Sequence, residues 1–316
     1  MLMRISFTTL LKTGLAVLAI QFPLTCIAAA QTKITIGVPP VPEFVLPMIA
    51  AEKGYFRDQG IDATIRIIPG GQSMPAALQS ASLQVAALSA TSLIQVTDSG
   101  LDLVIVSGGA IASIDDTNYG IVVGANSGIE KPEDFIGKKI GTPGLGSFFH
   151  IMAREWFHRK GVDWHKITFV ESTFPQLADL LTARTVDAVL STNPFLQRAA
   201  APGIGGRTFY IAADLPDRLP PFVYAGSRAW ADAHPEAATG FKLALDKAIA
   251  FEQSDLAATL EIFGKYVKMP PEILKTLTIN KLDTSVTPQQ VQLWVDMMEK
   301  QDMLRNFKSP DALFRK

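Results

Sequence analysis

The chain has 316 residues, a formal net charge of −1 at pH 7 and one cysteine, Cys26. No long run of one charge sign occurs, which argues against nucleic acid as a partner because proteins that bind nucleic acid present a basic face. Beyond residue 30 the chain has no cysteine, so that part has neither a disulfide nor thiol chemistry, and it is long enough for two domains of ordinary size.

Residues 1–30 have the pattern of an export signal. Arg4 and Lys12 give a positively charged start, Leu10 to Ile20 supplies an apolar stretch, and Ala28-Ala29-Ala30 supplies small residues for cleavage. A membrane anchor is the alternative, but polar residues and a proline interrupt the apolar stretch well before it reaches spanning length. We therefore expect a soluble periplasmic protein that is cleaved near Ala30.

Strands and helices alternate through the first part of the remaining chain. Strands are predicted at 33–38, 63–68, 83–88 and 103–106, with helices at 48–58, from Ser73 onward and at 91–98. This alternation indicates a mostly parallel sheet with helices on both faces.

Strands and helices alternate in the middle of the chain as well. Residues 119–123 are predicted to form a strand at one of the two places where the chain crosses between two lobes. They are followed by strands from 140, at 167–170, 186–190 and 209–212 and helices at 147–160, 176–183 and from 194. Residues 222–225 are expected to cross back, and the chain is expected to be helical from Arg228 to its end. There, four apolar residues at helical spacing predict core packing: Val291, Trp294, Val295 and Met298.

Three segments of the first part recur about a hundred residues later, in the same order. Ile36-Gly37-Val38-Pro39 recurs as Ile140-Gly141-Thr142-Pro143, and residues 55–62 and 78–85 recur as 156–163 and 181–188. We interpret this as an α/β fold of two lobes around a cleft. Residues 31–110 and 222–316 are expected to form lobe 1 and residues 111–221 lobe 2, with closure about Gly108-Gly109 and the strand at 222–224.

Equivalent glycine-bearing loops precede a helix in each lobe and are candidate ligand contacts. They are Gly70-Gly71-Gln72-Ser73 and Gly144-Leu145-Gly146-Ser147. Helix starts offer free N–H groups and attract anions, although an ordinary turn capped by serine remains the alternative for each loop.

A further pair of loops is expected to face each other across the cleft and to supply hydrogen bonds. These loops contain Ser89 and Thr91 in one lobe and Asn193 in the other. Aromatic residues occur near the same loops and predict an apolar wall for the ligand: Phe44, Phe148, Phe149, Phe174, Phe195, Phe222 and Tyr224. The predicted ligand site combines residues of all these loops. Its members are Phe44, Gly71, Gln72, Ser73, Ser89, Thr91, Gly109, Ser147, Phe148, Asn193, Phe195 and Tyr224.

Enzyme chemistry has little support in the sequence. The four histidines lack metal-ligand spacing, and we find neither a nucleophile elbow nor paired carboxylates in a loop. We expect no catalytic residue, no metal and no cofactor, with a minor ligand contact from His150.

Ala51-Glu52-Lys53-Gly54-Tyr55-Phe56 and Asp134 to Gly141 resemble periplasmic solute-binding proteins for sulfonates, taurine, nitrate and thiamine precursors. The resemblance implies the two-lobe type II periplasmic binding protein fold and delivery of a small molecule to the permease of an ABC transporter in the inner membrane. It departs from the family at Ala81 and Arg184, where glycine is usual, and at Gln84, where aspartate is usual.

The expected ligand is a small organic anion, a sulfonate or carboxylate with an apolar body, bound by a monomer. Two alternatives stay open: an enzyme on the same scaffold, of the menaquinone-pathway or pyrimidine-synthesis type, and a periplasmic ligand sensor.

Overall fold

The computed structural model describes residues 31–69 and 73–315. The expected export signal at 1–30 and the predicted site residues Gly71 and Gln72 lie outside the described residues. Within the described ranges, no helix has the length and apolar character needed to cross a membrane.

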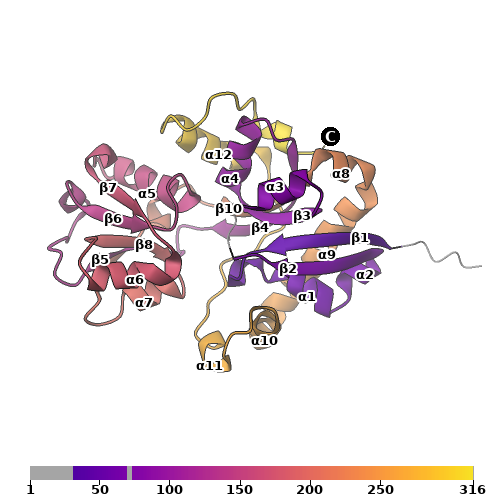
Figure 1. The fold of residues 1–316 in the computed structure, drawn as a ribbon, viewed down its shortest axis with the longest axis horizontal. Helices are drawn as coiled ribbons and strands as arrows, with labels where there is room; N and C mark the ends of the chain where they lie inside the picture. The colour runs from indigo at the N-terminus through magenta and orange to yellow at the C-terminus, as the bar shows by residue number, and fades with distance from the viewer. Residues whose placement is uncertain (1–30, 70–72, 316) are drawn as a thin grey trace, which may run out of the picture. The chain divides into compact units, whose positions relative to one another are not determined.

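The first sheet has five strands in the order β2-β1-β3-β10-β4 (Figure 1). The strands are β1 (Thr32–Val38), β2 (Ile61–Ile67), β3 (Val85–Ser89), β4 (Leu103–Ala112) and β10 (Leu219–Ser227). β1 pairs in parallel with β2 and β3, whereas β10 is antiparallel to both of its neighbours. The late strand β10 therefore returns the chain to the middle of a sheet that the first part of the chain begins.

The second sheet repeats this order as β7-β6-β8-β5-β9. Its strands are β5 (Tyr119–Gly124), β6 (Lys139–Thr142), β7 (Thr168–Glu171), β8 (Ala188–Thr192) and β9 (Gly205–Tyr210). β6 is parallel to β7 and β8, and β5 is antiparallel to β8 and β9. The structure thus has two mixed sheets of one topology, as the internal repeat predicts.

The repeat extends to single hydrogen bonds. The side-chain oxygen of Gln84 accepts from the Thr35 N–H at 2.8 Å, and the Asp187 carboxylate accepts from the Lys139 N–H at the same distance. The first bond ties the start of β3 to β1, and the second ties the start of β8 to β6. Gln84 therefore replaces the usual aspartate without loss of this contact.

Both residues that stand in place of the family's glycine adopt a left-handed backbone conformation. Ala81 has φ of 57° and Arg184 has φ of 55°, each just after a helix and before a strand. Residues with a Cβ are disfavoured there. The equivalent turns at Gly60 (φ 69°) and Gly161 (φ 73°) retain the residue that suits this geometry.

Helices cover both faces of each sheet. They are α1 (Leu46–Glu52), α2 (Tyr55–Asp58), α3 (Met74–Gln79), α4 (Ala90–Asp98), α5 (Phe148–Arg159), α6 (Phe174–Thr182), α7 (Phe195–Ala199), α8 (Arg228–Ala233), α9 (Pro235–Ser254), α10 (Leu256–Val267), α11 (Pro271–Leu274) and α12 (Pro288–Glu299). Short 3-10 turns lie at η1 (Pro42–Phe44), η3 (Pro132–Phe135), η4 (Trp164–Lys166), η5 (Ala212–Asp214) and η6 (Pro310–Leu313).

One hydrophobic cluster contains residues of both sheets, with Leu88 and Val223 from the first and Ile121 and Leu190 from the second. The apolar stripe of α12 is buried in this cluster, and its Trp294 indole N–H donates to the Pro220 carbonyl at 2.7 Å. The prediction that this stripe is core is confirmed.

Two helix predictions need correction. The predicted helix at 48–58 is two helices, α1 and α2, because Gly54 between them has φ of 77°. Ser73 occupies the position before α3 but makes no capping bond with its side chain.

The prediction of a helical end from Arg228 is wrong after Glu299, where the described chain has only the short turn η6, and also between α11 and α12. Here the chain is extended and runs along β4, with a bridge between Ala110 and Leu282. The Gly108 N–H donates to the Thr284 carbonyl at 2.7 Å, and the Ile111 N–H donates to the Lys281 carbonyl at 2.8 Å. β4 is an edge strand with free backbone groups, so a short polar segment can pair with it despite a weak strand pattern.

Candidate functional site

The aromatic residues near the predicted loops form one continuous row across both sheets. Neighbouring ring centroids lie 4.7 Å apart for Phe44 and Phe222, 4.8 Å for Phe222 and Phe148, 4.0 Å for Phe148 and Phe149, 5.3 Å for Phe149 and Phe174, and 5.4 Å for Phe174 and Phe195. Tyr224 joins the row beside Phe44, at 6.4 Å. The structure therefore brings the predicted aromatic set together, and contact with a ligand stays a prediction.

Two of the three predicted serines, Ser89 and Ser147, cap the helices that follow them. Ser89 Oγ accepts from the Ser92 N–H at 3.1 Å and lies 3.2 Å from Thr91 Oγ1. Ser147 Oγ donates to the Gly144 carbonyl at 2.7 Å and accepts from the His150 N–H at 3.5 Å. Both hydroxyls thus have local partners, and for the loop that ends at Ser147 this matches the alternative of an ordinary turn capped by serine.

Asn193 lies where elements of the two sheets meet. Its Nδ2 donates to Asn118 Oδ1 at 2.7 Å and to Thr278 Oγ1 at 3.3 Å. Its Oδ1 is buried and has no hydrogen-bond partner among the residues that the structure describes. A polar atom in this state is ready to accept a bond from a ligand.

The remaining predicted residues differ in exposure. Ser73 is exposed, whereas Tyr224 is buried and its hydroxyl lacks a partner within the described part of the chain. Burial raises the pKa of Tyr224 far above its ordinary value. Gly109 lies in β4, where a Cβ would come within 3.2 Å of the Phe222 carbonyl oxygen.

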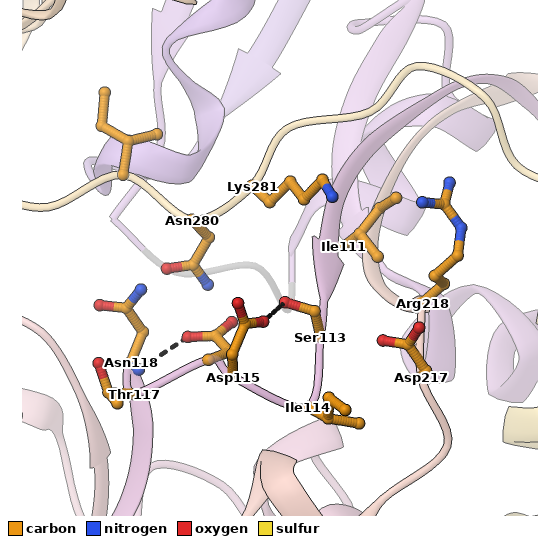
Figure 2. A pocket seen from close by; sticks show the side chains of 12 residues that line it. Ile111, Ser113, Ile114, Asp115, Thr117, Asn118, Asp217, Arg218, Asn280 and Lys281 are labelled. Carbon is orange, nitrogen blue, oxygen red and sulfur yellow. Dashed lines mark hydrogen bonds between the residues drawn. The ribbon is translucent and has the colours of Figure 1, made fainter.

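A pocket of about 550 Å³ opens beside the chain that links β4 to β5, and Figure 2 shows it from close by. The link contributes residues 113–118, and the extended segment contributes residues 279–281. Ile111, Asp217 and Arg218 complete the lining. No predicted site residue lines this pocket, so sequence reasoning missed it.

Two adjacent carboxylates, Asp115 and Asp116, belong to this pocket, and the expectation of no paired carboxylates in a loop is wrong. Asp115 is exposed and accepts from the Ser113 hydroxyl, while Asp116 is half-buried and accepts from the Asn118 N–H at 2.8 Å. Burial raises the pKa of Asp116 above its ordinary range. The pair is visible in the sequence, but its partner residues are not.

Glu43 adds a third carboxyl group near Asp116. Its side chain is 3% exposed, and its Oε2 makes no hydrogen bond to any described residue. Burial, with a smaller contribution from the Asp116 charge, raises the pKa of Glu43 to about 7. A carboxyl group in this environment changes its charge near neutral pH.

Asn280 and Tyr119 bridge the same neighbourhood. The Asn280 amide donates to the Tyr119 hydroxyl, and burial together with the Glu43 and Asp116 charges raises the pKa of Tyr119 well above its ordinary value. Asn280 is 3% exposed, and its Oδ1 is without a partner in the described ranges. Figure 2 shows its amide directed into the pocket, toward the loop that carries Asp115.

His150 is buried beside the loop before α5. Its Nδ1 accepts from the Gly146 N–H at 2.9 Å, and burial, with a smaller contribution from Arg154, lowers the pKa of His150 to about 3. The neutral ring therefore holds the loop. Across residues 31–69 and 73–315 no three histidine, cysteine or acidic side chains are grouped to hold a metal ion.

The sequence was compared with known families and proteins. The family model described as "NMT1/THI5 like" matches residues 41–255. Curated protein sequences gave no significant match.

Solved structures of periplasmic binding proteins share the fold. The periplasmic aliphatic sulphonate binding protein SsuA from Escherichia coli has a TM-score of 0.73 and 18% identity, over 90% of this chain and 99% of that one. The alkanesulfonate-binding protein SsuA from Xanthomonas axonopodis pv. citri, bound to MOPS, has a TM-score of 0.72 and 18% identity, over 91% and 100%. The periplasmic nitrate-binding protein NrtA from Synechocystis PCC 6803 has a TM-score of 0.71 and 15% identity, over 90% and 85%.

Proposed function

The chain belongs to the NMT1/THI5-like family, and from this premise we propose that it is the solute-binding component of an ABC importer. It would take up a small molecule in the periplasm, as a monomer, and present it to the permease subunits in the inner membrane. The observation that supports this most is the pair of sheets with identical strand order, joined by one row of aromatic side chains. Open sheets of this kind bind ligands beyond the carboxyl ends of their strands.

The ligand-binding surface proposed here combines the aromatic row with the polar residues at the strand ends. Phe44 and Phe148 are buried and Phe222 is half-buried in this structure, so we propose that these rings face the body of the ligand only when the two halves separate, and that Asn193 Oδ1 accepts a bond from it. The helix starts at Ser89 and Ser147 offer N–H groups and a partial positive charge to an acidic group. A small organic anion, a sulfonate or carboxylate with an apolar body, matches these features.

Binding is proposed to proceed by closure of the two halves, residues 31–110 with 222–316 and residues 111–221, about the solute. Contacts between them include Gln95 Nε2 to the Gly146 carbonyl at 3.2 Å and Gln301 Nε2 to the Ile151 carbonyl at 3.2 Å. A ligand that touches both halves binds best when such contacts are formed, and only this difference in affinity can shift the equilibrium.

A thermal-shift screen of the protein from Gln31 onward tests the proposed function. The panel contains alkanesulfonates, aromatic and aliphatic carboxylates, nitrate, pyrimidines and neutral sugars. A ligand at a few hundred times its dissociation constant stabilises the folded state by about 3 kcal/mol, which is a clear rise in melting temperature. Binding of inorganic nitrate or a neutral sugar alone would contradict the organic-anion proposal.

The variant Asn193→Ala tests the placement of the site with any solute that the screen identifies. Loss of a buried hydrogen-bond partner should weaken binding by about 1 to 3 kcal/mol, measured by titration calorimetry. Gln292→Ala, on the exposed face of α12, is the control and should bind with unchanged affinity. Unchanged affinity in Asn193→Ala would place the site elsewhere.

A further inference from the structure

We propose that the pocket beside Glu43 receives an amino or amidino group of the solute, so that the ligand is an organic amine or an amino-substituted acid. This inference rests on the proposed function and narrows its ligand class. It starts from side chains that nothing in the family resemblance assigns.

The pocket has an excess of acidic groups. Asp115, Asp116 and Asp217 line it, against Lys281 and Arg218. Arg218 is already paired with Asp283 outside the pocket lining, at 2.9 Å. After the hydrogen bond from Ser113, the charge of Lys281 contributes to lowering the pKa of Asp115. Neither Asp116 nor Glu43 forms an ion pair with a residue that the structure describes.

The atoms without partners are acceptors. Glu43 Oε2 and Asn280 Oδ1 are both buried and make no hydrogen bond to the described part of the chain. The Tyr119 hydroxyl already accepts from the Asn280 amide. Buried acceptors are costly unless a donor reaches them, and a buried carboxylate is stable only when it is paired.

An ammonium group supplies three donors and no acceptor, and an amidinium supplies several donors in one plane. Either satisfies this set, whereas an anionic group is repelled by three carboxylates. A metal ion is a weaker fit because no group of three metal-ligand side chains occurs among the described residues. The pocket volume of about 550 Å³ is in the range of small-molecule sites.

Matched pairs of probes test the inference, the amino group of the first member being replaced by hydrogen in two pairs and by a hydroxyl group in the third. The pairs are 3-aminopropanesulfonate and propanesulfonate, 4-(aminomethyl)benzoate and 4-methylbenzoate, and benzylamine and benzyl alcohol. Calorimetric titration at pH 8 is expected to give at least tenfold tighter binding for the amino member of at least one pair. Sodium and calcium chloride serve as probes for a simple cation site.

Glu43→Gln and Asp116→Asn should each reduce the amino preference, the ratio of the two affinities within a pair, at least fivefold by weakening the binding of the amino member. Glu130→Gln is the control, since Glu130 is exposed and outside the pocket. Far-UV circular dichroism and melting curves establish that each variant is folded. If one of the two variants does not fold, the other still tests the inference.

The outcomes separate the two proposals. Equal affinities within every pair, binding of amine-free members only, or displacement by calcium would overturn the inference and leave the solute-binding function standing. A preference that survives both variants would overturn it as well. Silence of all six probes overturns it too, and silence of the wider screen in addition counts against the proposed function.

Discussion

At the scale of single residues, the structure contains a buried carboxyl group and two residues with a Cβ in an unfavourable backbone conformation. Glu43 follows a run of prolines and would pass for a surface carboxylate, yet it is 3% exposed. Ala81 and Arg184 stand where the family usually has glycine, and both have positive φ. We expect each of these residues to affect the free energy of unfolding.

Glu43→Gln should change how stability depends on pH. The pKa of Glu43 is about 7 in the folded protein against 4.5 ordinarily, so between these values the folded state holds a proton that the unfolded state releases. The contribution of Glu43 to the free energy of unfolding therefore falls by roughly 3 kcal/mol as pH rises from about 4.5 to about 7. Above that pH it is constant.

Urea denaturation at pH 5 and pH 8 measures this effect. Glu43→Gln should lose less stability than the wild type between the two pH values, by roughly 3 kcal/mol, and Glu130→Gln should match the wild type. Asp116, whose pKa is also raised, contributes in the same direction in all three proteins. The interpretation fails if Glu43→Gln and the wild type have parallel pH profiles.

Ala81→Gly and Arg184→Gly should each stabilise the fold by about 1 kcal/mol, because glycine adopts positive φ without a Cβ clash. The double variant should gain about the sum, since the sites lie on different sheets. Ala76→Gly, in the interior of α3, is the matched control and should destabilise by about 1 kcal/mol. Thermal unfolding compares the four variants, and a loss of stability in both glycine variants would contradict the strain.

At the scale of elements, the decisive feature is the extended segment that pairs with the edge of β4. It places Asn280 and Lys281 in the pocket, and it does so through backbone bonds to Gly108 and Ile111. Close approach of two backbones requires that no side chain intervene. Gly108 meets this condition, because a Cβ there would lie 2.5 Å from the Asp283 carbonyl oxygen.

Gly108→Ala should therefore destabilise the protein by about 2 to 3 kcal/mol and displace the segment. Gly206→Ala is the control, since its added Cβ would have its nearest neighbour at 3.5 Å, an ordinary contact. Hydrogen exchange of the Gly108 and Ile111 amides by mass spectrometry should accelerate in Gly108→Ala only. Unchanged stability and exchange would show that the segment does not depend on this close approach.

At the scale of the whole molecule, residues far apart in the chain join the two sheets. The aromatic row and one shared hydrophobic cluster contain side chains from both. Under the proposed closure, the polar contacts between the halves add to ligand affinity only when they form. They should affect dissociation more than association.

Gln95→Ala is predicted to speed ligand release and to raise the dissociation constant about two- to tenfold, because its bond to the Gly146 carbonyl is lost. Gln292→Ala, which bonds only to Asp296 on the same helix, should leave release unchanged. Stopped-flow measurements with a solute found in the screen give both rates. A change confined to the association rate would argue against closure as the source of affinity.

The order of the strands, most of the helices between them, the internal repeat and the family resemblance could be predicted from the amino-acid sequence. These properties depend on local periodicity and on short motifs such as Ile36-Gly37-Val38-Pro39, which act within a few residues. The sequence also predicted that the aromatic residues gather, because equivalent loops of a repeated fold lie at equivalent sheet edges.

Which polar groups are buried together could not be predicted before the folded structure was known. Glu43 lies more than two hundred positions before Asn280 in the chain, with Asp116 between them, and none of the three has a motif around it. Their pKa values and missing partners arise from desolvation, which depends on what packs around a side chain and not on its neighbours in sequence. The extended segment was missed for the same reason, since the free edge of β4 that it pairs with lies about 170 residues earlier in the chain.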